Sequence, residues 1–337
     1  MQPRLEWLLV LAPVSALARY ALDDDTLVFF TAAGAVLPLA GLIGRGTDQL
    51  ALHAGPKIGG LLNATFGNVT ELIIAILLVR RGELEIVKAS LTGSILGNLL
   101  LVLGLSFFVG GLRNEEQRFN ADTASIHTTS MMLAVVGLLM PALFVATSGR
   151  HDLAEREVVS GTIAGILILL YVAVLVFTLV THGHLFRVAG TGERPAWSVR
   201  TSVLVLLGAT VFVAFESELL VGSMAPTLES LGLSRFFVGL ILVPIIGNAA
   251  EHSSALLFAL RDQLDTTLEI AIGSSIQIAL FVAPALVFIS LALGHPMDFV
   301  FSPFEVAAVG GATIIVALSR TTAGRTGSRA PSWSRPT

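Results

Sequence analysis

The stretch that organises this chain reads Gly59-Gly60-Leu61-Leu62-Asn63-Ala64-Thr65-Phe66-Gly67-Asn68-Val69-Thr70-Glu71-Leu72-Ile73-Ile74-Ala75-Ile76. It places a glutamate, two asparagines and three glycines inside a mainly apolar run. A second version follows 180 residues later and reads Gly239-Leu240-Ile241-Leu242-Val243-Pro244-Ile245-Ile246-Gly247-Asn248-Ala249-Ala250-Glu251-His252. Aligned without a gap, residues 57–104 and 237–284 are identical at 13 of 48 positions, and seven of these are glycine or polar. The chain therefore contains an internal repeat.

Composition indicates a protein of the lipid bilayer. Hydrophobic residues make up 54% of the 337 residues, charged residues only 13%, and the mean hydropathy is +0.83. Soluble domains average about 25% charged residues. The net charge of −4 gives no reason to expect a nucleic-acid partner. Cysteine is absent, which excludes disulfides and thiolate metal sites.

Membrane spans of roughly 20 apolar residues are expected in ten segments: 5–21, 26–43, 57–79, 84–110, 122–145, 158–181, 200–224, 234–260, 266–293 and 302–319. The first is interpreted as a span, because no small-residue cleavage site follows it. The weakly apolar segment 45–56 is expected to be re-entrant or interfacial. The links are short and polar, so any chemistry must take place within the membrane layer.

The fold class expected is an all-α integral membrane protein with two halves. The N-terminal half, 1–181, holds the first repeat with its core at 57–110, and a linker follows at 182–199. The C-terminal half, 200–319, holds the second repeat with its core at 237–293. The basic tail, 320–337, is rich in Ser, Arg, Gly and Pro and is expected to be disordered.

Charge distribution predicts the orientation. With the N-terminus inside, 13 of the 20 Lys and Arg residues lie on inner segments, which favours both termini in the cytoplasm. Glu71 lies in the third predicted span and Glu251 in the eighth. Because this offset is odd, the two repeats enter the membrane from opposite sides. That is the inverted-repeat architecture of secondary transporters, whose binding site lies near the midplane.

The two glutamates are the leading candidates for function, because an ionisable residue at the centre of a span costs about 2.5–3.5 kcal/mol. Asn68 lies three residues before Glu71 and shares its helix face, and Asn248 precedes Glu251 in the same way. The competing interpretation is a structural pair of glutamates, each hydrogen-bonded to its asparagine. Further candidate oxygen ligands and close-approach glycines are Ser90, Ser94, Asn98, Ser274, Ser275, Gln277, Gly67 and Gly247. Interhelical packing is the alternative role for these serines and amides.

An oxygen-rich site with two carboxylates and no thiolate suits Ca²⁺, which takes 6–8 oxygen ligands, whereas Mg²⁺ holds its waters too tightly for such a cage. Mn²⁺ and Cd²⁺ remain open as alternatives. Two glutamates are neutralised by one Ca²⁺ or by two protons. The empty site is doubly charged and is the state that hydrocarbon disfavours most, so exchange is expected rather than leak. No cofactor is expected beside the transported ions.

Three other residues enter the proton-coupling hypothesis. His252 follows Glu251 and is interpreted either as a proton relay or as a structural hydrogen-bond donor. Glu216 and Glu218 lie two apart in the seventh predicted span, so they do not share a helix face. Glu218 is expected to act as a gate or relay, and Glu216 to lie nearer the membrane interface.

Two stretches resemble the paired signatures of the cation/proton exchangers, a branch of the calcium/cation antiporter superfamily: Gly67-Asn68-Val69-Thr70-Glu71-Leu72-Ile73 and Gly247-Asn248-Ala249-Ala250-Glu251-His252. The resemblance covers roughly residues 40–319 and extends through Thr181-His182-Gly183-His184-Leu185-Phe186, Ser217-Glu218, Gly273-Ser274-Ser275-Ile276-Gln277 and Met297-Asp298-Phe299-Val300-Phe301. It implies calcium/proton antiport in which Glu71 and Glu251 bind both ions. It further implies supporting roles for Asn68, Asn248, Ser94, Ser274, Gln277 and His252.

The chain departs from that family in two places. Family members usually have an eleventh span, whereas 320–337 is too polar to cross a membrane. Many also carry an acidic run between the sixth and seventh spans, where 183–198 holds only Glu193. The second departure removes any basis for assigning that run a role here. The first affects folding or homo-oligomerisation, which the sequence leaves open, more than the ion site.

Two alternatives of other classes stay open at this point. One is a sodium-coupled cation exchanger or a channel on the same scaffold, although the Gly-Thr-Ser-x-Pro-Glu pattern typical of the sodium-coupled branch is absent. The other is an intramembrane protease, which is disfavoured because no Gly-x-Gly-Asp element occurs. The protein is therefore not expected to be an enzyme. The Ala-, Gly- and Arg-rich composition favours a prokaryotic inner membrane, with a vacuolar membrane as the alternative.

Overall fold

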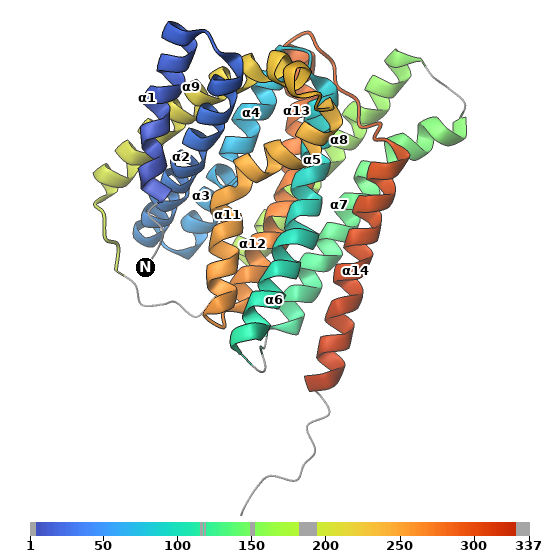
Figure 1. Cartoon of the computed structure of the whole chain (residues 1–337). Coiled ribbons are helices and arrows are strands. Elements are labelled where there is room, and N and C mark those ends of the chain that lie inside the picture. The colour runs from blue at the N-terminus through green and yellow to red at the C-terminus, as the bar shows by residue number, and fades with distance from the viewer. Residues whose placement is uncertain (1–4, 115–116, 118, 149–151, 182–193, 328–337) are drawn as a thin grey trace, which may run out of the picture.

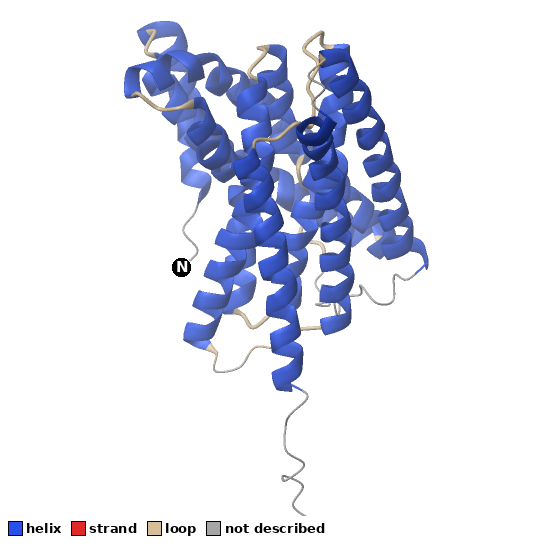
Figure 2. Cartoon of the chain, turned by 90° about the vertical axis from the view of Figure 1, so that its right-hand side faces the viewer, coloured by secondary structure: helices blue, strands red, loops and turns tan. Residues whose placement is uncertain are grey.

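The structure is a computed structural model that describes residues 5–114, 117, 119–148, 152–181 and 194–327. Regular structure within these residues is entirely helical (Figure 2). Eight of the described helices are long and apolar enough to cross a membrane. The remaining two predicted spans, 5–21 and 302–319, are also helical. The predicted all-α membrane fold is confirmed.

Within the described residues, the first half contains one 3₁₀-helix, eight α-helices and three π-helical segments. In chain order they are η1 (Leu5–Val10), α1 (Leu11–Leu17), η2 (Ala18–Leu22), α2 (Asp25–Ala54), α3 (Pro56–Phe66), α4 (Val69–Arg80), α5 (Leu84–Leu96), η3 (Gly97–Val102), α6 (Leu103–Arg113), α7 (Ala121–Ser148), α8 (Leu153–Leu175) and η4 (Val176–Thr181). The second half contains α9 (Val199–Leu231), α10 (Arg235–Phe237), η5 (Val238–Leu242), α11 (Val243–Leu260), α12 (Leu264–Gln277), η6 (Ile278–Val282), α13 (Ala283–Ala292) and α14 (Pro303–Gly327).

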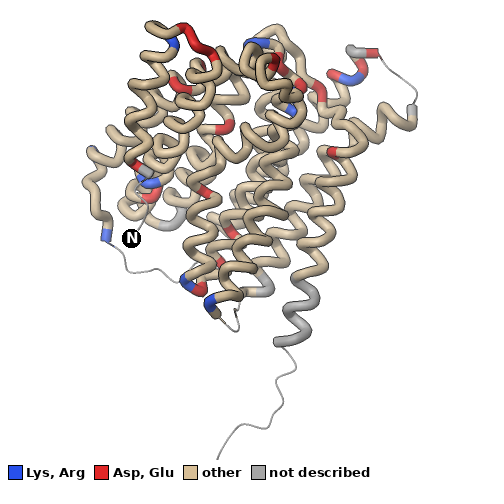
Figure 3. The backbone as a smooth tube through the Cα atoms, viewed as in Figure 1, with Lys and Arg blue, Asp and Glu red and all other residues tan. Residues whose placement is uncertain are grey.

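The two repeats run in opposite directions through the bundle (Figure 1). We call the end that carries the loop Asp23–Asp25 the upper end, and the end that carries the turn at Asp262 the lower end. The α3–α4 pair runs upward, whereas α10, η5 and α11 run downward. Lys, Arg, Asp and Glu gather mainly at these two ends, with a few acidic residues between them (Figure 3). This distribution is that of a protein whose central layer lies in hydrocarbon.

The structure corrects two expectations about helix ends. Segment 45–56 is not a separate re-entrant segment, because α2 continues without a break to Ala54. Gly55 then turns the chain with φ +81°, a conformation that glycine adopts without strain. Pro56 opens α3 at a position where its missing N–H would have no helical partner. In the tail, α14 continues to Gly327, and residues 328–337 lie outside the described part.

The long helices α2 and α9 pack against each other along one side of the bundle. Their backbones come close at Gly46, where a Cβ would lie 3.2 Å from Leu206 Cβ. The largest fully buried side chains, among them Phe29, Ile74 and Leu220, surround the repeats. The ion-site candidates on α4 and α11 are thereby held in the interior, between α2 and α9 on one side and α5 and α12 on the other.

The repeats pack more tightly against each other at the upper end than at the lower end. At the upper end α5 packs on η5 so tightly that a Cβ on Gly93 would lie 2.1 Å from the Leu240 carbonyl oxygen. A Cβ on Gly239 would meet Ala89 Cβ at 2.7 Å. Gly273 is the repeat equivalent of Gly93, and nothing lies within 4 Å of its Cβ position. On that side α3 packs against α2 and η4 rather than against α12.

Candidate ion-binding site

The helix of the first repeat is broken at the signature motif. α3 ends at Phe66 and α4 begins at Val69, so Gly67 and Asn68 lie between two helices. Gly67 N–H donates to the Asn63 carbonyl at 2.8 Å, and Leu72 N–H donates to the Asn68 carbonyl at 3.0 Å. Within the described chain, the carbonyls of residues 64–67 accept no backbone hydrogen bond. Such carbonyls are oxygen ligands for a hard cation.

Each glutamate lies against the signature glycine of the other repeat. A Cβ on Gly247 would lie 3.3 Å from Glu71 Oε1, and a Cβ on Gly67 would lie 3.6 Å from Glu251 Oε1. The two carboxyls are close enough for their charges to interact. The glycines therefore allow two acidic side chains from opposed repeats to converge in one place.

The signature asparagines pair across the repeats with the serines of the following helices. Asn248 Nδ2 donates to Ser94 Oγ at 3.1 Å, and Ser274 Oγ lies 3.3 Å from Asn68 Oδ1. Ser274 also lies 2.5 Å from Glu251 Oε2. Because Asn68 matches Asn248 and Ser94 matches Ser274 in the alignment, the two crossed contacts are related by the repeat symmetry.

Gln277 and His252 extend the site without symmetry. Asn68 Nδ2 donates to Gln277 Oε1 at 2.5 Å, so Gln277 joins the pair made by Ser274. His252 Nε2 lies 3.1 Å from Asn98 Oδ1, and an amide oxygen can only accept. The Nε2–H of His252 therefore donates to Asn98 of η3.

Several buried oxygens of the site have no partner among the described residues. They are both carboxylate oxygens of Glu71 and Oδ1 of Asn248. A small cavity lies beside Glu71 and is lined by Ser90, Ser94 and apolar side chains. No group of three or more His, Cys, Asp or Glu side chains that could hold a metal occurs in the described chain, so neutral oxygens would have to complete a cation site here. Buried oxygens without donors are the groups that a cation would stabilise.

Tyr171 of α8 contacts the helix break and was not predicted from the sequence. Its hydroxyl donates to the Ala64 carbonyl at 3.2 Å, one of the carbonyls released by the break. Its ring stacks on Phe281 of η6, with centroids 5.2 Å apart. Leu179, further along the chain in η4, packs against the backbone of Gly60 in α3, where the glycine has no side chain. Because α8 lies outside both repeats, the repeat alignment carried no signal for this residue.

The structure places Glu216 and Glu218 opposite to expectation. Glu216 is 0% exposed, whereas the Glu218 side chain is 47% exposed at the upper end. Glu218 pairs with Arg81 at 2.7 Å and does not contact the two site glutamates. The order was misjudged because two residues change the direction of a helical side chain by about 200°. The neighbouring helices decide which direction is buried.

The remaining stretches of the family resemblance lie away from the glutamates. In the 297–301 stretch, Asp298 pairs with Lys88 of α5, and Phe299 N–H donates to Ser160 Oγ at 2.9 Å. These contacts fasten the loop between α13 and α14 over the upper end. The 182–186 part of the histidine-containing stretch lies outside the described residues.

Comparison with known proteins gives the family. The model of the sodium/calcium exchanger protein family matches residues 25–180 and 201–333. The chain belongs to this family. The Ca²⁺/H⁺ antiporter of Synechocystis sp. is 44% identical over 329 residues, covering 92% of this chain and 88% of that protein. The Ca²⁺/H⁺ antiporter ChaA of Bacillus subtilis is 42% identical over 325 residues, covering 94% and 92%.

The exchanger fold is matched along almost the whole chain. The solved structure of native YfkE superposes with a TM-score of 0.81 at 37% sequence identity and covers 95% of each chain. The resemblance to cation/proton exchangers noted in the sequence is therefore confirmed. The assignment of individual ion ligands stays a prediction.

Proposed function

We propose that this exchanger carries Ca²⁺ out of, and protons into, the compartment at its lower end, through one site shared by Glu71 and Glu251. The observation that carries the proposal is the convergence of the two glutamates, each on the signature glycine of the opposite repeat. The relatives named as Ca²⁺/H⁺ antiporters support the choice of ions. The protein acts as a transporter and not as an enzyme.

The ligand set follows from the contacts around the glutamates. Both carboxylates supply the charge, and Asn248 Oδ1, Ser94, Ser274 and the carbonyls of the helix break supply neutral oxygens. Asn68 and Gln277 hold each other at 2.5 Å and complete the wall of the site. This set gives the 6–8 oxygens of flexible geometry that Ca²⁺ requires, and it is also compatible with Mn²⁺.

Charge balance then enforces exchange. One Ca²⁺ or two protons cancel the charge of −2, and either loaded state is neutral. The empty site carries two uncompensated charges inside the membrane, which is strongly disfavoured. Loaded sites therefore pass between the two ends and empty sites do not. The tighter packing of the repeats at the upper end supports loading from the lower end in this conformation.

Protons and Ca²⁺ compete for the same oxygens in this mechanism. The apparent Ca²⁺ affinity is expected to fall as the pH on the loading side falls, because protonation of either carboxyl removes a ligand and a charge. Two interacting carboxyls titrate as a pair, so the pH dependence belongs to both. Ca²⁺ binding that is indifferent to pH would exclude the shared site.

The direct test is uptake of radiolabelled Ca²⁺ into sealed vesicles that contain the purified protein. Uptake is expected only with an imposed pH gradient, and a protonophore should abolish it. The matched control is the double variant Glu71→Gln plus Glu251→Gln, reconstituted in the same amount. Uptake driven by a sodium gradient would instead indicate a sodium-coupled exchanger, and uptake without a counter-ion a channel.

A further inference from the structure

Glu216 is a buried acid that the exchange mechanism does not use. It lies on α9 and faces α1, where its Oε2 is 2.7 Å from the Ser15 hydroxyl oxygen. Both residues are 0% exposed. Glu216 Oε1 is buried and has no hydrogen-bond partner among the described residues. The contact joins the first helix of the chain to the long helix of the second half.

The Ser15 hydroxyl has one hydrogen and two short contacts. Its oxygen lies 2.7 Å from the Ala12 carbonyl oxygen and 2.7 Å from Glu216 Oε2. A carbonyl oxygen can only accept, so the Ser15 hydrogen satisfies that contact when it points to Ala12. The second contact is then a hydrogen bond only if Glu216 is protonated and donates to Ser15 Oγ. With Glu216 protonated, both short contacts of Ser15 Oγ are hydrogen bonds.

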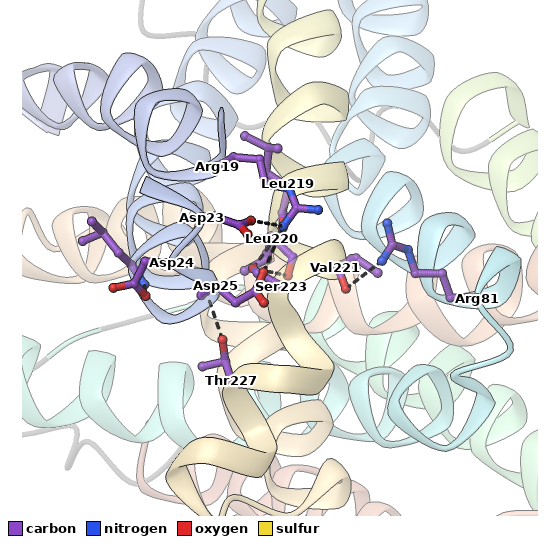
Figure 4. A network of polar contacts seen from close by, with 11 residues as sticks. Arg19, Asp23, Asp24, Asp25, Arg81, Leu219, Leu220, Val221, Ser223 and Thr227 are labelled. Atoms are coloured by element: carbon purple, nitrogen blue, oxygen red, sulfur yellow. Dashed lines mark hydrogen bonds and ion pairs between the residues drawn. The ribbon is translucent and has the colours of Figure 1, made fainter. Parts of the chain in front are cut away.

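No cation is available to hold Glu216 as a carboxylate. α1 carries no charged residue. Arg200 lies at the opposite end of α9, 16 residues before Glu216. The other arginines of the surrounding elements are paired with other acids: Arg19 with Asp25, Arg45 with Glu6, and Arg80 and Arg81 with Glu218. Figure 4 shows Arg19 turned to the Asp23–Asp25 loop and Arg81 reaching the Val221 carbonyl. The remaining titratable residues on these helices lie elsewhere: Asp48 and His53 toward the lower end of α2, Glu229 near the upper end of α9, and Glu71 in the ion site.

Ionised Glu216 would therefore be a buried charge with one hydrogen bond and no counter-charge, which is strongly disfavoured. We propose that Glu216 binds a proton of its own, and that this proton fastens α1 to α9. The proton is separate from those exchanged at Glu71 and Glu251, because Glu216 belongs to neither repeat core. At alkaline pH, loss of this proton leaves an uncompensated charge buried between α1 and α9, and hydration of that charge releases α1 from the bundle.

The proton itself is tested by infrared spectroscopy in the Glu71→Gln plus Glu251→Gln background, where the two site carboxyls are absent. Subtracting the spectrum of the same protein carrying Glu216→Gln should leave the carbonyl band of one protonated carboxylic acid at neutral pH. This band should be unchanged by saturating Ca²⁺. A difference spectrum that shows only carboxylate bands would overturn the proposal. The result does not depend on whether the protein exchanges Ca²⁺.

The release of α1 is tested with single cysteines, since the chain has none of its own. Ala18 is 0% exposed and lies one turn after Ser15, whereas the neighbouring Leu17 is 57% exposed. The maleimide labelling rate of Ala18→Cys, divided by that of Leu17→Cys, should rise severalfold at alkaline pH. With Glu216→Gln, which keeps the neutral shape, the ratio should stay low at every pH. The fastening role would be contradicted if the ratio did not change with pH in the protein that retains Glu216. It would also be contradicted if the ratio rose equally in the Glu216→Gln variant.

Discussion

The two repeats share a signature but differ in backbone. Gly67-Asn68 lies in a break between α3 and α4, whereas Gly247-Asn248 lies inside the continuous helix α11, which is π-helical only at its start, in η5. The Gly-Asn pair and the following glutamate are the same in both repeats, so these shared residues do not by themselves decide whether the helix breaks. Packing decides it: the start of the second repeat is pressed onto α5, and the start of the first is drawn onto α2 and η4.

This difference is compatible with the proposed mechanism, in which the two repeats take turns in closing the two ends. The contact of Gly93 with Leu240 closes the upper end, and its repeat equivalent, Gly273 with Gly60, is absent from the lower end. Exchange of these two states of contact between the repeats would close the lower end and open the upper one. The asymmetry of the structure is thus a property of the conformation, and the chemistry of the two glutamates should remain equivalent.

The largest effect is expected from the glutamates, and it tests that equivalence. Glu71→Gln or Glu251→Gln leaves a charge of −1, which cannot neutralise Ca²⁺ and binds one proton instead of two. Each variant should therefore abolish exchange in the vesicle assay and still insert, because an amide costs less in the membrane than a charge. Retention of near-normal exchange by either variant would break the equivalence of the repeats.

Alanine substitutions at the equivalent glycines Gly93 and Gly273 should have different effects, because Gly93 lies in the tight contact at the upper end and Gly273 lies at the lower end. Gly93→Ala would place a methyl group 2.1 Å from the Leu240 carbonyl oxygen, and overpacking of this kind costs about 1–3 kcal/mol. Gly273→Ala meets open space in this conformation. We expect Gly93→Ala to lower the thermal unfolding midpoint of the purified protein clearly, and Gly273→Ala to leave it unchanged. Both should slow exchange, since each blocks closure of one end. Equal midpoints would mean that the upper contact does not hold this conformation.

Substitutions of Ser94 and Ser274 should lower the apparent Ca²⁺ affinity to different extents, although the two serines occupy equivalent positions in the repeat alignment. Ser274→Ala removes a hydrogen bond to the carboxylate of Glu251, and Ser94→Ala removes one from the neutral amide of Asn248. Hydrogen bonds to charged groups contribute about 1.5–3 kcal/mol and neutral ones about 1 kcal/mol. The concentration of Ca²⁺ for half-maximal uptake should rise about tenfold for Ser274→Ala and about threefold for Ser94→Ala, with similar maximal rates. The reverse order would place the stronger ligand in the first repeat.

Tyr171→Phe is expected to affect only the helix break of the first repeat. The change keeps the ring stack on Phe281 and removes the donor to Ala64, a loss of about 1 kcal/mol. We expect about fivefold weaker apparent Ca²⁺ affinity with an unchanged maximal rate. Tyr20→Phe is the matched control, because Tyr20 is 74% exposed and is the only other tyrosine in the chain. Identical behaviour of the two variants would show that the hydroxyl does not position the break.

The sequence was sufficient for the features that depend on pattern. The repeat, its inversion and the helical spans follow from period and charge. The crossed pairs of Asn68 with Ser274 and of Asn248 with Ser94 use residues that the alignment singles out. Features that depend on contacts between distant segments could not be predicted from the sequence. These include the break at Gly67, the extension of α2 through 45–54, the helical residues 320–327 of the tail and the contact of Tyr171 with Ala64.

The order of Glu216 and Glu218 illustrates this boundary. Both are acids in one apolar helix, and each would be compatible with a buried or an exposed position. Glu218 meets Arg81 of α4, whereas Glu216 meets a serine of α1. Which acid finds a cation depends on the rotation of α9 relative to helices more than a hundred residues away, and no local property of the chain reports that rotation.

The crossed contacts have a consequence for how such a chain can arise. Neither repeat completes the ligand set alone, because each asparagine pairs with the serine, and each glycine with the glutamate, of the other repeat. A shorter polypeptide with one repeat could build the same cage only with a second copy inserted upside down beside it. Fusion of two such genes would remove the need for a single product to insert in both orientations. Each half could then acquire its own topology signals and its own accessory helices.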